Sequence, residues 1–148
     1  MQLPRFNIRV YSLWLNDQDQ ILVSDERIGD FKFTKFPGGG LEYGEGIKEC
    51  LKREWKEELN LEIEVCDHFY TTDFFQSSAF HVDTQIISIY YLVKPTEHLT
   101  FDVQRVKHNF SLEGHEEVLF RWINLKDLSV DIVDLPIDKV IVNKLLSM

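Results

Sequence analysis

Hydrophobic residues follow two periodicities along this chain, and together they predict a strand-rich protein with two helices. Apolar runs rich in β-branched and aromatic residues predict strands at 6–15, 21–24, 31–34, 61–65, 69–75, 85–93 and 118–123. The polar turn at 16–19 indicates that the first two strands form a hairpin. A helical period occurs at 47–59 and again after Pro136, to about residue 146. This order of elements predicts an α/β (α+β) fold with a mixed sheet between helices.

The helix at 47–59 carries acidic residues on its apolar side. At about 100° per residue, one arc of this helix holds Ile47, Leu51, Trp55 and Leu59. Glu54 and Glu58 fall within the same arc, and Glu57 lies at its border. A charge that faces a core must be paired, neutralised or coordinated to a metal, and Mg²⁺ takes oxygen ligands. The alternative is a solvated helix face on which Glu49 and Arg53 form an ordinary i, i+4 pair.

A glycine-rich segment precedes this helix. It reads Gly38-Gly39-Gly40-Leu41-Glu42-Tyr43-Gly44-Glu45, and glycine lets a backbone approach a phosphate or a metal closely. The sequence contains neither a Walker A loop nor a GxGxxG fingerprint. Five residues separate Gly39 from Glu45, and after seven more comes Arg53-Glu54-Trp55-Lys56-Glu57-Glu58-Leu59-Asn60-Leu61. The informative feature is therefore the fixed distance between the glycines and the acidic helix.

This spacing resembles the Nudix box, whose pattern is Gly, five residues, Glu, seven residues, Arg-Glu-apolar-any-Glu-Glu-any-Gly-apolar. Two positions depart from it: Trp55 is bulkier than the usual aliphatic residue, and Asn60 replaces the last glycine. Neither is a carboxylate, and Asn can adopt the left-handed cap conformation. The resemblance implies the Nudix fold, an α/β/α sandwich around a mixed sheet. It also implies a hydrolase that cleaves the pyrophosphate of a nucleoside diphosphate linked to another moiety, with Mg²⁺, or alternatively Mn²⁺, as cofactor.

The resemblance also implies roles for individual residues. Glu57 and Glu58 match positions that hold the metal, and Glu54 matches a ligand or a base. Arg53 matches the arginine that orients a box carboxylate, which is Glu45 or Glu57 here. A backbone ligand is expected at Gly38 or Gly39, and one more acid from the segment Glu113-Gly114-His115-Glu116-Glu117. In that segment Glu116 has the better spacing to the following strand, and Glu117 is the second choice.

Composition narrows the classes of partner and location. With 148 residues and 44% hydrophobic content, the chain is expected to form a single domain over residues 1–148, and the resemblance implies that this is a Nudix domain. Its net charge of −9 argues against binding to a nucleic-acid backbone. The apolar runs are too short to span a membrane, the first residues do not read as a signal peptide, and Cys50 and Cys66 have no metal or redox spacing. A cytoplasmic protein with reduced thiols is predicted, and the resemblance implies that it acts on a small nucleotide-type molecule.

Several alternatives stay open at this point. A non-catalytic Nudix sensor that binds a nucleotide would usually carry a degraded box or an added DNA-binding domain. An isoprenyl diphosphate isomerase of the same fold would need a cysteine where neither Cys50 nor Cys66 lies. The aromatic cluster Tyr70, Phe74, Phe75 and Phe80 serves either a nucleobase or the core, with core packing the commoner use. The nucleotide substrate is not readable from the sequence, and a homodimer is expected only by analogy with relatives.

Overall fold

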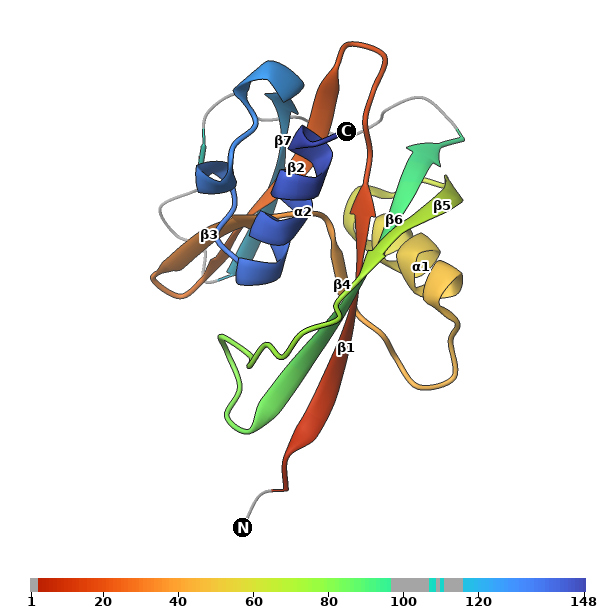
Figure 1. Cartoon of the computed structure of the whole chain (residues 1–148). Helices are drawn as coiled ribbons and strands as arrows, with labels where there is room; N and C mark the ends of the chain where they lie inside the picture. Colours follow the sequence, from red (N-terminus) through yellow and green to blue (C-terminus); the bar gives the residue numbers. More distant parts are fainter. Residues whose placement is uncertain (1–2, 97–106, 109, 111–115) are drawn as a thin grey trace. The chain divides into compact units, whose positions relative to one another are not determined.

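The computed structural model describes residues 3–96, 107, 108, 110 and 116–148. Within them lie seven strands, two α-helices and two short 3₁₀ helices (Figure 1). The strands are β1 (Arg5–Leu13), β2 (Gln20–Ile28), β3 (Phe31–Lys35), β4 (Gly38–Gly40), β5 (Ile63–Thr71), β6 (Thr84–Pro95) and β7 (Glu116–Asn124). The helices are α1 (Ile47–Leu59), α2 (Pro136–Leu146), and the 3₁₀ turns η1 (Leu125–Asp127) and η2 (Val130–Ile132). The chain divides into two compact units, each with its own sheet and one α-helix.

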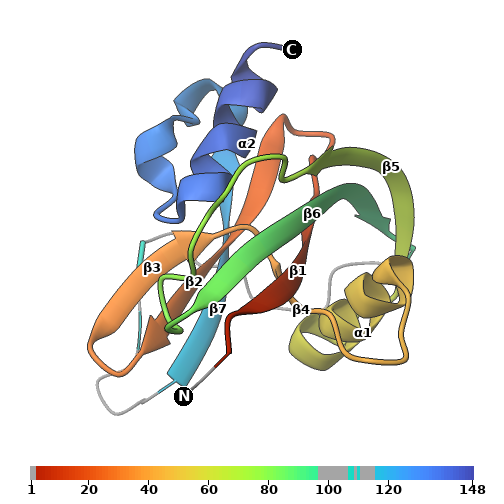
Figure 2. The ribbon, with the colours of Figure 1, turned by 60° about the horizontal axis from the view of Figure 1, so that its bottom comes forward.

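Unit 1, residues 1–12 and 38–100, holds a mixed sheet in the order β4-β1-β6-β5. Strands β1 and β4 are antiparallel, with Val10 opposite Gly39, and β5 and β6 are antiparallel as well. The arrowheads of β1 and β6 lie at the same end of the sheet (Figure 1). Helix α1 contacts β4 and β5 (Figure 2), and the buried Trp55 donates a hydrogen bond from Nε1 to Ser12 Oγ on β1 at 2.9 Å. The glycine strand is thereby held beside the helix.

Unit 2, residues 13–37 and 101–148, holds the antiparallel sheet β3-β2-β7 together with α2. Its interior contains charge as well as apolar side chains. Asp25, with no exposed surface, accepts hydrogen bonds from Arg121 Nε at 2.8 Å, Arg121 Nη2 at 3.0 Å and Thr34 Oγ1 at 2.6 Å. The backbone N–H of His108 also donates to Asp25, at 3.0 Å. This buried ion pair links all three strands of the sheet.

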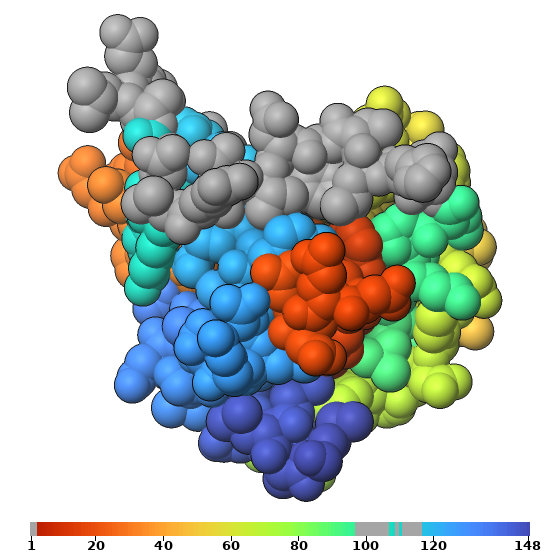
Figure 3. Space-filling model, turned by 90° about the horizontal axis from the view of Figure 1, so that it is seen from above, coloured from red at the N-terminus to blue at the C-terminus, as the bar shows by residue number. Residues whose placement is uncertain are grey.

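A shallow polar depression of about 450 Å³ lies at one end of unit 2. It is lined by Gln18, Asp19, Asn124, Leu125 and Lys126. Figure 3 shows the turn at 16–19 (orange-red) at the surface beside the segment that follows β7 (light blue). The two segments are tied by a hydrogen bond from the Leu125 N–H to the Asp19 carbonyl, at 2.9 Å.

The mixed α+β class predicted from the sequence is confirmed, and its strands are divided between two sheets. Helix α1 has the predicted bounds, and Asn60 takes the left-handed cap conformation with φ 51°. The predicted hairpin of the first two strands is present but short. The Leu15–Ile21 bridge and the hydrogen bonds from the Asn16 N–H to the Gln20 carbonyl (2.9 Å) and from the Leu22 N–H to the Trp14 carbonyl (3.1 Å) join the two segments. Beyond these residues β2 pairs with β3 and β7. The strands predicted at 61–65 and 69–75 are one bulged strand, β5. No helix in the described part of the chain is long and apolar enough to cross a membrane.

The Asp25–Arg121 pair predicts how unit 2 responds to mutation and to acid. Burial alone would raise the pKa of Asp25, but the hydrogen bonds from Arg121 and Thr34 hold it below the ordinary 3.8. Asp25→Asn leaves the buried guanidinium without its counter-charge, so we expect a loss of about 3–5 kcal/mol in unfolding free energy at pH 7. Because the folded pKa is the lower one, the carboxylate stabilises the fold above pH 3.8 and ceases to do so as the pH falls through the folded value.

Denaturant titrations of the parent and variant at several pH values measure this difference. The control is Glu64→Gln, which removes one partner of the exposed Lys94–Glu64 pair and should cost about 1 kcal/mol or less. Equal losses for the two variants would contradict a structural role for the buried pair.

Candidate active site

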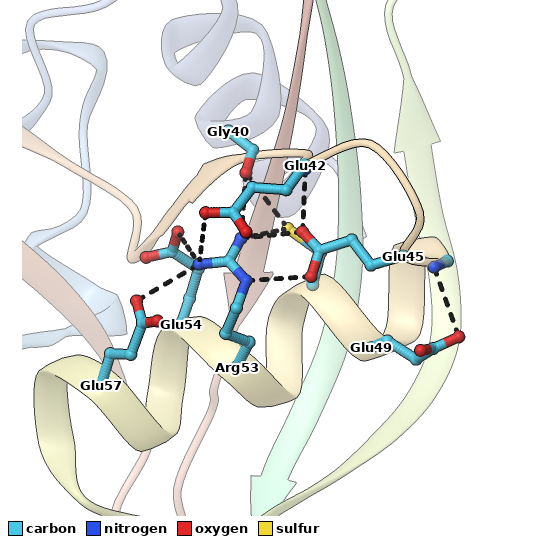
Figure 4. Close-up of polar contacts among 9 residues, drawn as sticks. Gly40, Glu42, Glu45, Glu49, Arg53, Glu54 and Glu57 are labelled. Atoms are coloured by element: carbon cyan, nitrogen blue, oxygen red, sulfur yellow. Dashed lines mark hydrogen bonds and ion pairs between the residues drawn. The ribbon is translucent and has the colours of Figure 1, made fainter.

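Helix α1 begins and ends at well-defined residues, and this sets which side chains face the glycine strand. Gly46 is the N-cap, and its N–H donates to the Glu49 side chain at 3.3 Å, so Glu49 serves the cap. Asn60 closes the helix by donating its N–H to the Lys56 carbonyl at 3.1 Å. Between these caps the successive turns of α1 present Arg53, Glu54 and Glu57 to one cluster (Figure 4). The cluster lies wholly within unit 1.

The guanidinium of Arg53 is the centre of this cluster. Nε donates to Glu45 Oε2 at 2.9 Å, and Nη2 donates to Glu45 Oε1 at 2.8 Å, which is a bidentate pair. Nη2 also donates to the Gly40 carbonyl at 3.1 Å. The loop before α1 closes over this pair, since the Glu42 N–H donates to Glu45 Oε1 at 2.9 Å. One side chain of the helix is therefore joined to the strand β4 and to the loop between them.

The remaining nitrogen, Nη1, gathers further carboxylates (Figure 4). It donates to Glu54 Oε1 at 3.1 Å and to Glu57 Oε2 at 3.2 Å. Glu42 Oε1 forms a longer ion pair with it at 3.6 Å. The carboxylates differ in exposure: 13% of the Glu54 side chain is exposed, against 60% for Glu57 and 67% for Glu42. The cluster thus has a buried side at Glu54 and an open side at Glu57.

Gly39 permits the close contact between β4 and the acidic helix. A Cβ atom at this position would overlap the carboxylate of Glu54, whereas one at Gly40 would meet only the end of the Arg9 side chain, at 3.2 Å. At Gly38 a Cβ would overlap the backbone of β1, and its φ of 157° also disfavours other residues. Gly39 therefore lets the backbone of β4 lie against a carboxylate of the helix.

The charges of the cluster are strongly coupled. The hydrogen bonds from Arg53, with a further one from the Glu42 N–H, lower the pKa of Glu45 to about 2. The same carboxylate raises the pKa of Arg53 above its ordinary value, so this guanidinium is always charged. Burial raises the pKa of the Cys50 thiol to about 12, so Cys50 stays protonated, and its sulfur lies 3.6 Å from the Gly40 carbonyl. The cluster holds one permanent cation among several acids.

Comparison with known proteins identifies this arrangement. The NUDIX domain family matches residues 5–144. The chain belongs to the NUDIX family. No curated protein matches its sequence. Among solved structures, it resembles the solution structure of the E. coli ORF135 protein, with 16% identity, a TM-score of 0.71, and coverage of 97% of this chain and 91% of that one. The MutT protein from Methanosarcina mazei Go1 shows 19% identity, a TM-score of 0.67 and coverage of 99% and 96%. A UDP-X diphosphatase shows 16% identity, a TM-score of 0.62 and coverage of 99% and 64%.

Membership of the NUDIX family confirms the expectation of a Nudix hydrolase, and it implies a small nucleotide-type substrate and a divalent metal. The structural neighbours, all below 25% identity, support the fold. Neither kind of comparison identifies the substrate or the metal.

The structure brings four of the Nudix box residues together: Glu45, Arg53, Glu54 and Glu57. Arg53 binds both candidate partners, Glu45 and Glu57, and the alternative pair with Glu49 does not form, because Glu49 caps the helix. Glu58, predicted to face the core, is exposed. A helical wheel gives the direction of a side chain from the helix axis, but not how far the neighbouring layer extends along it. Sequence reasoning missed three members of the cluster, Gly40, Glu42 and Cys50. Only their position between the box glycine, Gly39, and Arg53 could have indicated them.

The loop acid stays unassigned. Glu116 is the first residue of β7, opposite Ile28, but its side chain and residues 111–115 lie outside the described part of the structure. Glu117, the second choice, forms an ion pair with Arg27 at 3.2 Å within unit 2. That contact gives Glu117 a structural role in the sheet.

The oxygen atoms of the described cluster are of the type that binds a hard divalent cation, but their arrangement does not form a complete metal site. Within the described residues no group of three His, Cys, Asp or Glu side chains is arranged to hold a metal ion. Glu54 and Glu57 nevertheless lie within 3.2 Å of the same atom, Arg53 Nη1, so the two turns of α1 bring two carboxylates to one charge. Carboxylate and carbonyl oxygens are the ligands that Mg²⁺ and Mn²⁺ prefer.

The Arg53–Glu45 pair predicts an unusual titration. In chelator, the side-chain carboxyl of Glu45 should titrate near pH 2, because the guanidinium donates two hydrogen bonds to it. In Arg53→Met its pKa should rise toward the ordinary 4.5 but stay below it, because the hydrogen bond from the Glu42 N–H remains. Carboxyl ¹³C chemical shifts measure both values. Since the folded pKa is the lower one, the pair stabilises the fold above pH 4.5 and loses that effect as the pH falls toward 2. A midpoint near 4.5 in the parent protein would show that the pair does not form.

Proposed function

We propose that this protein is a Mg²⁺-dependent Nudix hydrolase, able to use Mn²⁺, which cleaves the pyrophosphate of a nucleoside diphosphate linked to another moiety. The observation that carries this proposal is the convergence of Glu45, Glu54 and Glu57 on Arg53 beside a strand of glycines. In such an arrangement the carboxylates can bind a cation, and the cation can hold an anionic substrate. The family match over residues 5–144 supports one Nudix domain spanning residues 1–148.

The metal is assigned to the oxygen atoms of the box. Glu54, Glu57 and Glu58 from α1 would hold it with the carbonyl of Gly38, and Glu116 would complete the set from β7. A bound divalent cation would offset the charge of the diphosphate and make a water more acidic near neutral pH. Without a cation, a protein of net charge −9 would repel an anionic substrate.

Residues of the box would position the carboxylates and accept the proton of the attacking water. Glu45 anchors Arg53, and Arg53 in turn fixes the carboxylates of Glu54 and Glu57. Glu54 is the candidate base: its side chain is 13% exposed, and the backbone of Gly39 lies against its carboxylate. A carboxylate confined by the Gly39 backbone is positioned to accept a proton from the attacking water with little reorganisation.

The net charge of the chain bears on the class of its substrate. The acidic balance favours small nucleotides over nucleic acid as substrates. A cytoplasmic location and a homodimer are proposed with the activity. The panel that tests the substrate includes nucleoside triphosphates, dinucleotides and nucleotide-sugars, the last suggested by the UDP-X diphosphatase among the structural neighbours.

Removing single metal ligands should abolish most activity without unfolding the protein. Glu57→Gln and Glu58→Gln each keep the shape of the side chain but lose a charged oxygen ligand, so turnover should fall at least about a hundredfold. The matched control, Glu62→Gln, removes an exposed acid beyond the box and should leave turnover unchanged. Phosphate release from the panel, with Mg²⁺ and with chelator, measures this. Near-normal turnover of both variants at limiting Mg²⁺ would overturn the ligand assignment; nucleotide binding without any turnover in the parent would indicate a sensor.

The close approach at Gly39 supplies a second test. In Gly39→Ala the new methyl group displaces the flexible carboxylate of Glu54, so turnover should fall by roughly tenfold to a hundredfold. The melting temperature should change little, because a side-chain end moves more easily than backbone. Gly40→Ala is the control, since its methyl group meets only the end of Arg9. Equal turnover in the two variants would mean that the position of Glu54 does not matter.

A further inference from the structure

Glu42 is built into the active-site cluster through its backbone, while its side chain stays exposed. Its N–H donates to Glu45 Oε1 at 2.9 Å, and its carbonyl accepts the Glu45 N–H at 3.2 Å. These two bonds fix the start of the side chain beside Arg53. The carboxylate itself is 67% exposed and lies 3.6 Å from Arg53 Nη1 (Figure 4). That distance is longer than a good charge-assisted hydrogen bond, so the contact has room to shorten.

Arg53 cannot follow its carboxylates if they move. Nε and Nη2 are fixed by Glu45, and Nη2 also by the Gly40 carbonyl. Nη1 therefore stays at one place, with Glu54, Glu57 and Glu42 around it. Only two of these three carboxylates are among the metal ligands proposed above.

A divalent cation and Nη1 compete for Glu54 and Glu57. As these carboxylates turn to a cation, Nη1 loses acceptors, and the two positive charges repel each other. The lost hydrogen bonds and the repulsion weaken metal binding unless another acceptor binds Nη1. We propose that Glu42 is this acceptor: it is a positioning residue that binds Arg53 Nη1 more closely when Glu54 and Glu57 bind metal. The inference rests on the function proposed above, because it needs a cation at the box.

The consequence is a measurable effect on metal affinity. Glu42→Gln removes the charge that compensates Nη1 in the metal-bound state, so the Kd for Mn²⁺ should rise by about two- to fivefold, as expected for an exposed ion pair. The side chain lies in an exposed loop, and the backbone bonds of residue 42 are retained, so the variant should fold normally. The effect should be carried by Arg53 rather than by the loss of one negative charge.

A double-mutant cycle on the full chain separates these causes. Mn²⁺ binding is measured by calorimetry and by EPR for the parent, Glu42→Gln, Arg53→Met and the double variant. In the Arg53→Met background, Glu42→Gln should have almost no effect on the Kd. The control Glu49→Gln also removes one exposed acid from this region, but glutamine can still cap the helix and Glu49 points away from Arg53 (Figure 4). Its Kd should match that of the parent.

The outcomes distinguish the inference from the function on which it rests. No Mn²⁺ binding by the parent would overturn the proposed function itself. Binding by the parent with an unchanged Kd in Glu42→Gln, or an effect that persists in Arg53→Met, would overturn only the role of Glu42. If Arg53→Met fails to fold, the Nη1 protons of Arg53 provide the readout by NMR. On addition of Mg²⁺ these protons should stay protected from exchange in the parent and lose protection in Glu42→Gln.

Discussion

The bidentate pair between Arg53 and Glu45 is the interaction on which the site depends. It joins the middle of α1 to Glu45, the residue before the N-cap Gly46, and through Nη2 it reaches the carbonyl of Gly40 in β4. Two nitrogens are thereby used for architecture and the third is left for Glu54, Glu57 and Glu42. The planar guanidinium is suited to this division, because its donors point in fixed and different directions. A lysine could hold one of these groups but not the whole set.

A second arginine–carboxylate pair in the same chain shows how burial decides the use of such a pair. Asp25 and Arg121 in unit 2 are almost fully enclosed, and every oxygen of Asp25 is engaged by Arg121, Thr34 or His108. A pair like this is costly to break and has no surface for a ligand. Arg53 has 22% of its side chain exposed, and Glu57 beside it is mostly exposed. The same chemistry stabilises a sheet where it is enclosed and meets solvent where a substrate can arrive.

The local sequence pattern was sufficient to predict the elements whose bounds depend on neighbouring residues. The bounds of α1, its cap at Asn60 and the start of α2 at Pro136 follow from periodicity and capping alone. The pairing of strands does not, because it depends on residues distant in sequence: β2 meets β7, almost a hundred positions away, rather than β1. In the site, the box spacing predicted Arg53, Glu54 and Glu57 as one group. It could not predict that Arg53 binds Glu45 and Glu57 together, nor that Glu58 is exposed, since both depend on the depth and direction of the neighbouring strand and loop.

The position of Arg53 also changes the electrostatic reading of the acidic helix. From the sequence alone, carboxylates on an apolar arc require pairing, neutralisation or a metal for the fold to tolerate them. In the structure the guanidinium lies among them and offsets part of their repulsion, so the protein carries its own cation at the site. The fold then has less need of metal. If Glu54 and Glu57 hold the metal as proposed, its binding would have to displace their contacts with Arg53. The metal affinity would then be set by a competition between two cations, one fixed to α1 and one from solution.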